Sequence, residues 1–188
     1  MKAIKTRIVS VAAAGLLFLF SHCSKSGGDA IKIEGFTLTD YNGNLLSYIG
    51  PRDSDWLFIS KLSAKELVLF DFSTPSSLDN TFPVNVNFDR IGVYPNPAST
   101  QQFYALSASD SILMKIVVVN SSLKVLAQHA VKAKGPVTIG MDFHDRSIYP
   151  DGSVYRVYFS LSAKDHVNYK FGYGDIKICD DSNVTHCF

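Results

Sequence analysis

The chain after residue 30 predicts an all-β fold made of antiparallel strands. Apolar residues recur there with a period of two, in short runs that are rich in Val, Ile, Phe and Tyr. Gly, Asn, Asp, Ser and Pro separate the runs, as turns require. No stretch in this part of the chain has a helical period. Several short strands at regular spacing indicate a β-sandwich.

The first part of this region predicts a smaller β unit over residues 31–90. Two strands are expected on either side of Asn42-Gly43, because this dipeptide suits the positive φ values of a tight hairpin turn. A loop is expected over residues 73–83, which are rich in Ser, Pro, Asp and Asn. The remaining apolar runs predict strands over residues 55–60, 66–72 and 84–88.

The stretch GVYPNPAST, residues 92–100, follows this unit and contains two prolines one residue apart. Pro95 and Pro97 cannot donate to a sheet ladder, and each favours extended backbone at the residue before it. We therefore expect a stiff extended joint, which leads into a second and larger β unit over residues 91–188.

The second unit predicts a strand over residues 103–109 and then a hairpin that turns at Asn120 and Ser121. The first arm of this hairpin, residues 111–119, is apolar on both faces and is therefore expected to be a central strand. Gly172 and Gly174 are expected to mark a bulge in the last strand. Further strands are expected over residues 135–143, 153–162 and 167–178.

Residues 153–162 show the clearest alternation in the chain. Their apolar set is expected to point into the core, and the set between is expected to point outward. The inward residues are Tyr155, Val157, Phe159 and Leu161, and the outward residues are Arg156, Tyr158 and Ser160.

The amino terminus has the pattern of a secretory signal. MKAIKTR is basic, and residues 8–20 form an apolar run that only Ser10 interrupts. The run falls short of the roughly 20 apolar residues that a membrane-spanning helix needs. We therefore expect residues 1–22 to be a signal peptide whose helix is removed on maturation.

Cys23 closes the apolar run, and the polar tract SKSGGD follows it. This arrangement resembles a bacterial lipoprotein signal, in which signal peptidase II cuts before a cysteine that receives acyl chains. The resemblance implies that Cys23 is lipidated, that residues 23–30 form a flexible tether, and that the membrane is a partner through this anchor. It places the protein at the outer membrane, on the periplasmic or the cell-surface side. Cleavage by signal peptidase I near Ser24 or Ser26 is the alternative, and it would leave a soluble periplasmic protein.

The charge of the mature chain excludes a nucleic-acid-binding role. Removal of residues 1–22 takes away Lys2, Lys5 and Arg7, so 15 of the 18 basic residues remain against 17 acidic ones, and the net charge is −2. The remaining lysines and arginines are scattered singly instead of forming a basic groove.

Two cysteines remain after Cys23, in the tail sequence CDDSNVTHC. A disulfide between Cys179 and Cys187 is the expected pairing in an exported protein. A metal site that adds Asp180 and His186 is the alternative, but the tail lacks the second closely spaced pair that zinc sites show. We therefore expect no metal and no cofactor.

The segment that opens with Tyr94, Pro95, Asn96 and Pro97 resembles a known family over residues 91–178, about half of the chain. The motif and the order of the strands behind it are similar to the carboxyl-terminal sorting domain of type IX secretion. They are also similar to the Ig-like domain of flagellar hook-capping proteins. The resemblance implies an Ig-like β-sandwich for this half, and an export signal as one use of it.

Three groups of residues are candidate functional sites. Asp142 and His144 at a predicted strand end, with Asp145 and Asp151 in the loop that follows, could build a calcium or hydrolytic site, although turn composition explains them as well. Asp40, Asn42, Asp53 and Asp55 could ligate calcium, but no full loop pattern appears. The stripe Tyr169, Phe171 and Tyr173 could stack on a glycan if exposed, or form core if buried.

These observations predict a membrane-anchored envelope lipoprotein that acts as a non-catalytic interaction or structural module, because no catalytic motif is found in the chain. Its partner, a protein or a glycan, is not specified by the sequence. One alternative is a surface carbohydrate-binding lipoprotein. The other is a type IX secretion cargo whose carboxyl-terminal domain is a sorting signal.

Overall fold

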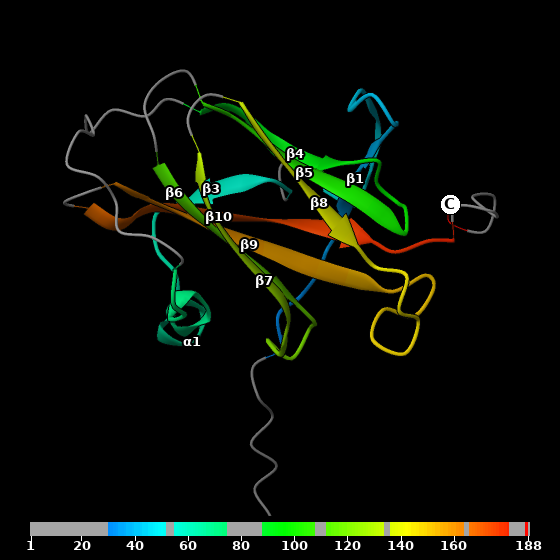
Figure 1. Ribbon diagram of the computed structural model, residues 1–188. Coiled ribbons are helices and arrows are strands. Elements are labelled where there is room, and N and C mark those ends of the chain that lie inside the picture. The colour runs from blue at the N-terminus through cyan, green and yellow to red at the C-terminus, as the bar shows by residue number, and fades with distance from the viewer. Residues whose placement is uncertain are drawn as a thin grey trace, which may run out of the picture.

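Two antiparallel sheets lie face to face and enclose the main hydrophobic core (Figure 1). One sheet has five strands in the order β3-β10-β9-β6-β7, and the other has three in the order β4-β5-β8. A further hairpin, β1-β2, is joined to the hairpin turn of the three-stranded sheet by a bridge between Thr39 and Asn96. This arrangement confirms the predicted all-β, antiparallel, sandwich-like fold.

The computed structural model describes residues 30–51, 55–74, 88–107, 112–133, 136–163, 166–180 and 187. The predicted signal peptide and Cys23 lie outside the described residues. Within the described ranges, no helix is long and apolar enough to cross a membrane. The strands are β1 Phe36–Thr39, β2 Leu45–Ile49, β3 Leu57–Ile59, β4 Phe88–Tyr94, β5 Thr100–Ser107, β6 Ile112–Val119, β7 Val125–Ala133, β8 Val137–Asp142, β9 Val154–Ala163 and β10 His166–Lys177.

Alternate residues of the facing strands build the main core. Tyr155, Val157, Phe159 and Leu161 of β9 all face it, as predicted for the inward side of this strand. Phe103 of β5 meets them from the other sheet, with its ring centroid 6.3 Å from that of Phe159. Aromatic contacts of this kind add to the area that both rings bury, so they help to hold the two sheets together.

The other face of the five-stranded sheet is covered as well. Leu69 and Phe70 pack there against Val117 and Tyr158. They belong to η1 (Val68–Phe70), which follows the short helix α1 (Ala64–Leu67), and Figure 1 shows α1 on the side of this sheet away from the three-stranded sheet. Strand β6 lies between β9 and β7 and is buried on both faces, which confirms its predicted central position.

The prediction of a strand over residues 66–72 is wrong, because this run forms the end of α1 and then η1. Ser63 and Glu66 form a capping box, in which each side chain accepts a hydrogen bond from the backbone N–H of the other. This Ser-x-x-Glu spacing is the sequence signal for the helix start. Lys115 of β6 then donates to the carbonyl of Phe70 and fixes the segment on the sheet.

Three residues of β9 that were predicted to point outward are buried instead. Arg156, Tyr158 and Ser160 do point away from the main core, but they are only 7%, 0% and 0% exposed. The covering segment explains this, because the Tyr158 hydroxyl donates to the Glu66 carboxylate at 2.6 Å. Alternation in one strand identifies its two faces, but it cannot tell that a second layer covers the polar one.

The predicted smaller unit over residues 31–90 shares its sheets with the rest of the chain. Strand β3 pairs with β10, and β4 runs across the predicted boundary between residues 90 and 91. Strand β4 also begins the hairpin β4-β5, so residues 95–99 are a hairpin turn and not a joint between two units. The sheet order places β4 at an edge, where the prolines after it interrupt no ladder.

Both predicted hairpins are confirmed. The turn between β1 and β2 is longer than the predicted two-residue Asn42-Gly43 turn, because Gly43 N–H donates to the carbonyl of Asp40 and Asp40 N–H donates to the carbonyl of Asn44. Gly43 has a φ of 77°, so glycine supplies the positive φ that this loop needs. The turn between β6 and β7 is held by the Asn120 side chain, which accepts hydrogen bonds from the backbone N–H groups of Ser122 and Lys124. Ile31 donates to the carbonyl of Ser121 at 2.8 Å, so the described chain starts against this turn.

The bulge expected at Gly172 and Gly174 lies earlier in β10, where the register shifts between His166 and Lys170. The two glycines instead allow the chain around β3 to approach β10 closely. A Cβ on Gly172 would collide with the carbonyl of Leu57, and a Cβ on Gly174 would collide with the ring of Trp56. Both positions therefore let the segment around β3 lie directly on β10.

Asn96 fastens the turn of the β4-β5 hairpin to the rest of the molecule. Its Nδ2 donates to the carbonyls of Thr37 (2.8 Å) and Asp175 (3.3 Å), and its Oδ1 accepts from the backbone N–H of Lys177 (2.9 Å). Its backbone exchanges two hydrogen bonds with Thr39. Asn96 is 1% exposed, so these bonds satisfy a polar side chain that is cut off from water.

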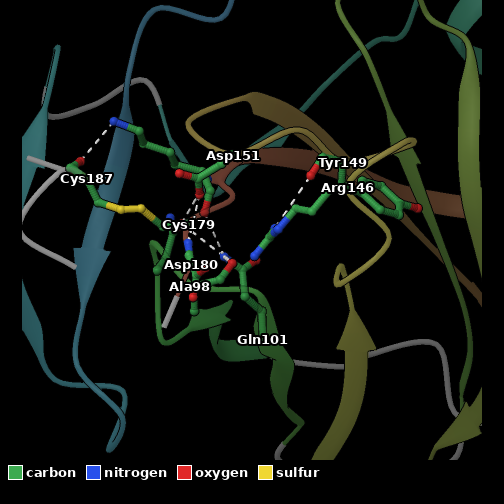
Figure 2. The surroundings of a disulfide bond; sticks show 10 residues. Ala98, Gln101, Arg146, Tyr149, Asp151, Cys179, Asp180 and Cys187 are labelled. Carbon is green, nitrogen blue, oxygen red and sulfur yellow. Dashed lines mark hydrogen bonds between the residues drawn. A yellow bond between two sulfur atoms is a disulfide. The ribbon is translucent and has the colours of Figure 1, made fainter. Parts of the chain in front are cut away.

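A disulfide between Cys179 and Cys187 closes the tail, as predicted, with the two Cα atoms 6.1 Å apart (Figure 2). The backbone N–H of Cys179 donates to the carbonyl of Ala98 at 3.4 Å. Lys177 Nζ donates to the carbonyl of Cys187 at 2.8 Å. The tail is therefore held next to the turn that contains the two prolines.

Candidate ligand-binding groove

Two adjoining hollows lie where the β1-β2 hairpin meets the three-stranded sheet, and both are lined by Gly43 and Tyr104. The first has a volume of about 250 Å³ and reaches Trp56, and the second has a volume of about 200 Å³ and reaches Thr138. We call the two together the aromatic groove. The lining residues used below are Thr37, Tyr48, Asp55, Trp56, Tyr94, Tyr104 and Thr138.

Tyr94 and Tyr104 form the middle of the groove. Their ring centroids are 5.2 Å apart and their planes are tilted by 57°. Gly43 lies over the Tyr94 ring, where an added Cβ would be 3.4 Å from the ring atoms. On β4, Gly92 gives room to Tyr104, because a Cβ there would lie 2.9 Å from the Tyr104 hydroxyl. Two glycines thus allow both rings to lie flat against backbone.

Trp56 forms the far end of the first hollow, immediately before β3. Its backbone has a positive φ of 55°, which is uncommon for a residue with a large side chain. The indole ring packs on the backbone of Gly174 and lies 5.9 Å from the ring of Phe103, between centroids. The half-buried ring is therefore held in place by the main core while it lines the groove.

Asp55 is the acidic residue of the groove lining. Its carboxylate accepts hydrogen bonds from the backbone N–H groups of Thr37 (2.6 Å), Trp56 (3.1 Å) and Asp175. It thereby connects β1 with β10. Burial raises the pKa of Asp55 to about 6, because desolvation outweighs the hydrogen bonds that favour the carboxylate.

The residue that donates its backbone N–H to Asp55, Asp175, belongs to a buried ion pair. Arg156 donates to both oxygens of Asp175, at 2.7 and 2.8 Å, and also to the carbonyl of Lys32 at 3.1 Å. Its guanidinium lies 4.0 Å from the centroid of the Tyr173 ring. Burial opposes the charge of Arg156, but the hydrogen bonds and attraction of Asp175 outweigh it and raise the pKa of Arg156. Asp55 is therefore linked, through the backbone N–H of Asp175, to a fixed and buried charge pair.

A second cluster brings Ser99, His144 and Asp142 together. Ser99 Oγ lies 3.3 Å from His144 Nε2, and His144 Nδ1 contacts Asp142 Oδ1 at 2.5 Å. The order serine, histidine, aspartate matches a hydrolase triad. The exposure of the two end residues is the reverse of that in a triad, because here the serine is buried and the aspartate is exposed. Ser99 is 2% exposed, whereas the side chain of Asp142 is 77% exposed. A catalytic serine must reach its substrate, and its aspartate is normally the buried member.

The predicted aromatic stripe is only partly described. Phe171 and Tyr173 are half-buried and pack against the second core, where Tyr173 also contacts Tyr158 with ring centroids 5.8 Å apart. The side chain of Tyr169 lies outside the described residues. The described part of the stripe is therefore engaged in packing.

Of the candidate calcium ligands, Asp55 connects β1 with β10, and Asp40 serves a turn. The Asp40 carboxylate accepts from the backbone N–H groups of Asn42 and Asn44 and from the Asn44 side chain. Asp53 lies outside the described residues. Among those that the structure describes, no group of three His, Cys, Asp or Glu side chains is placed to hold a metal ion.

Sequence reasoning missed the groove because its rings come from distant parts of the chain. Tyr48 and Trp56 precede the two prolines, whereas Tyr104 follows them, and no spacing links the three. The sequence did single out Tyr94 for the motif Tyr-Pro-Asn-Pro, Asn42 and Gly43 for a turn, and Asp55 as a calcium candidate, but none of them for a shared groove. Comparisons with protein-family models, with curated proteins and with solved structures find no match to this chain.

Proposed function

We propose that this protein is an exported lipoprotein, anchored in the outer membrane through Cys23, that presents a non-catalytic binding module. The basic and apolar signal segment, the cysteine that closes it and the polar tract behind it support the anchor.

The aromatic groove is the observation that carries the binding role. It combines two joined hollows with several aromatic rings and with hydroxyl and carboxylate groups beside them. Small-ligand sites are commonly concave surfaces of this kind, in which placed polar groups orient the ligand. The groups that look most like catalytic machinery, Ser99 and His144, lie elsewhere, and the serine is buried. We therefore infer that the site binds a ligand without transforming it.

The hydrogen bonds of Asn96 favour a permanent module over a removable sorting signal. They join the turn with the two prolines to Thr37 and Thr39, which precede the expected cleavage region near Arg90. Strand β3 precedes Arg90 in the sequence and β10 follows it, and these two strands are paired. Cleavage near Arg90 would separate strands that share sheets and would expose the buried residues between them.

The first experiment is the intact mass of the mature protein extracted from membranes, with Cys23→Ala as the control. We expect the mass of residues 23–188 plus acyl chains, less two hydrogens for the Cys179–Cys187 disulfide. The Cys23→Ala variant should lack the acyl mass and leave the membrane fraction. A product that ends near Arg90 would overturn the permanent module and favour the export cargo.

A further inference from the structure

We propose that the aromatic groove binds a neutral oligosaccharide that stacks on Tyr104 and Tyr94 and extends toward Trp56. This inference rests on the proposed function, because it names the ligand class of the same groove. From the sequence, the candidate glycan-binding surface is the stripe Tyr169, Phe171 and Tyr173. The proposal places it instead in the aromatic groove, where Tyr48 and Trp56 lie beside the three-stranded sheet.

The rings of the groove suit the apolar face of a sugar. A pyranose ring presents C–H groups on its faces and hydroxyls around its rim, and tyrosine and tryptophan likewise combine an apolar ring with a polar end. Tyr104 lines both hollows, and Tyr94 stands 5.2 Å from it, between centroids. Gly43 and Gly92 hold these rings close to backbone, so little ordering is needed when a ligand arrives.

Hydroxyl groups beside the rings supply hydrogen bonds for a sugar rim. Thr37 and Thr39 line the first hollow, and Thr138 lines the second from an exposed position on β8. The Thr39 hydroxyl donates to the carbonyl of Val93, so its oxygen is oriented and can accept a further bond. Sugar recognition needs such fixed polar groups, because buried hydroxyls without partners weaken binding.

The charge of the groove favours a neutral ligand. Among the residues that the structure describes, those that line the two hollows include no lysine, arginine or histidine, and Asp55 supplies a carboxylate. A phosphate or uronate would meet this carboxylate without a cation from the described lining to balance it. The lining therefore selects against acidic glycans.

The length of the groove favours an oligosaccharide over a single sugar. The hollows measure about 250 and 200 Å³ and meet at Gly43 and Tyr104. Together they lie in the range of about 300 to 1,000 Å³ that is typical of ligand sites, whereas either one alone falls below it. A chain of sugars can fill both hollows, and a monosaccharide can fill only one.

Trp56 is the only tryptophan of the chain and lines the first hollow, so its fluorescence reports on ligand in the groove. The full mature protein is titrated with neutral hexasaccharides of β-1,4-glucose, β-1,3-glucose, β-1,4-mannose and β-1,4-N-acetylglucosamine. Hexagalacturonate is the anionic comparator, and glucose is the monosaccharide comparator. We expect a saturable change with at least one neutral hexasaccharide at a Kd below about 1 mM. Glucose and hexagalacturonate should bind about tenfold more weakly or not at all.

Two variants test the location. Thr138→Phe fills the second hollow from an exposed strand position and should weaken hexasaccharide binding at least about tenfold, with an unchanged melting temperature. Gly140→Ala, on the same strand, is the control, because its Cβ would meet open space. Equal binding by wild type and Thr138→Phe would overturn the site.

The remaining outcomes separate this inference from the proposed function. No response to any neutral hexasaccharide up to about 10 mM, roughly 3 kcal/mol of binding, would overturn the saccharide class. A saturable response to an extended Val-Thr repeat peptide alone would also overturn it, because the occupant would then be a strand that adds to β2. Either result leaves the membrane anchor to be judged by the mass of the mature protein.

Discussion

The side-chain oxygen of Asn96 accepts a hydrogen bond from the backbone N–H of Lys177, 81 residues further along the chain. The amide nitrogen of the same side chain donates to the carbonyl of Thr37, 59 residues earlier. One buried side chain between two prolines therefore joins β1, the β4-β5 turn and β10. In the motif Tyr-Pro-Asn-Pro, the prolines make the turn stiff, and Asn96 ties this turn to β1 and β10.

Asn96→Ala is expected to lower the free energy of unfolding by about 3 kcal/mol. The substitution leaves the Lys177 N–H and the Thr37 carbonyl without their partner in a buried place, and each such group costs about 1 to 3 kcal/mol. Urea unfolding measures the change. Asn120→Ala is the matched control, since it removes two hydrogen bonds from a half-exposed turn and should cost about 1 kcal/mol. Equal losses in the two variants would contradict the special role of Asn96.

Asp55 is expected to make the protein less stable as the pH rises from about 4 to about 6. Its folded pKa of about 6 exceeds the ordinary value of 3.8, so the native state binds the proton more tightly than the unfolded state. This contribution is fully present below pH 4 and is lost as the pH passes 6, at up to about 3 kcal/mol. Denaturant unfolding of wild type and Asp55→Asn at pH 4 and pH 7 measures it.

The sign should reverse at Asp40, which serves as the control. Hydrogen bonds from the Asn44 side chain and backbone lower the pKa of the exposed Asp40 carboxyl. Its contribution is therefore present above the unfolded pKa and lost as the pH falls. The quantity compared is the free energy of unfolding of wild type minus that of the variant. For Asp55→Asn this difference should increase as the pH falls from 7 to 4, and for Asp40→Asn it should decrease. The same trend in both pairs would contradict the assignment of a raised pKa to Asp55.

Gly174→Ala is expected to displace Trp56 and to cost about 1 to 3 kcal/mol. An added Cβ would occupy the space of the indole ring, and core positions respond to overpacking on this scale. Tryptophan emission should shift to longer wavelength as the ring moves toward water, and thermal unfolding should give a lower Tm. Gly140→Ala should change neither, because its Cβ meets open space. An unaltered emission spectrum in Gly174→Ala would show that the ring does not lie on β10.

Ser99 is expected not to react with a fluorophosphonate probe. Its hydroxyl is 2% exposed beneath His144, so the probe cannot approach it, although the distances resemble those of a triad. Intact mass after prolonged incubation checks this, with Ser99→Ala as the comparator. A covalent adduct that Ser99→Ala abolishes would contradict the non-catalytic interpretation.

The sequence by itself determined the strands and their turns. Period-two runs and the Asn42-Gly43 and Asn120 turns fixed where β1, β2, β6 and β7 lie, because strand geometry and turn chemistry are local properties. The pairing of Cys179 with Cys187 was also predictable, because the chain has three cysteines and the lipoprotein-like signal predicts a separate role for Cys23.

Only the tertiary structure decided what covers the second face of the large sheet. A short apolar run such as residues 66–72 suits a strand or a helical turn equally well, and the choice was made by burial against Val117 and Tyr158. Arg156 is buried on the same side of β9, where it donates to the carbonyl of Lys32 and lies 4.0 Å from the centroid of the Tyr173 ring.

The groove likewise exists only in three dimensions. Trp56, Tyr94 and Tyr104 meet because β3 pairs with β10 and because Asn96 draws the β1-β2 hairpin toward the three-stranded sheet. Such contacts depend on which strands become neighbours, and neighbours far apart in sequence are chosen by the packing of the whole core. Local pattern thus determined the elements of this protein, and long-range packing determined the surface on which they act together.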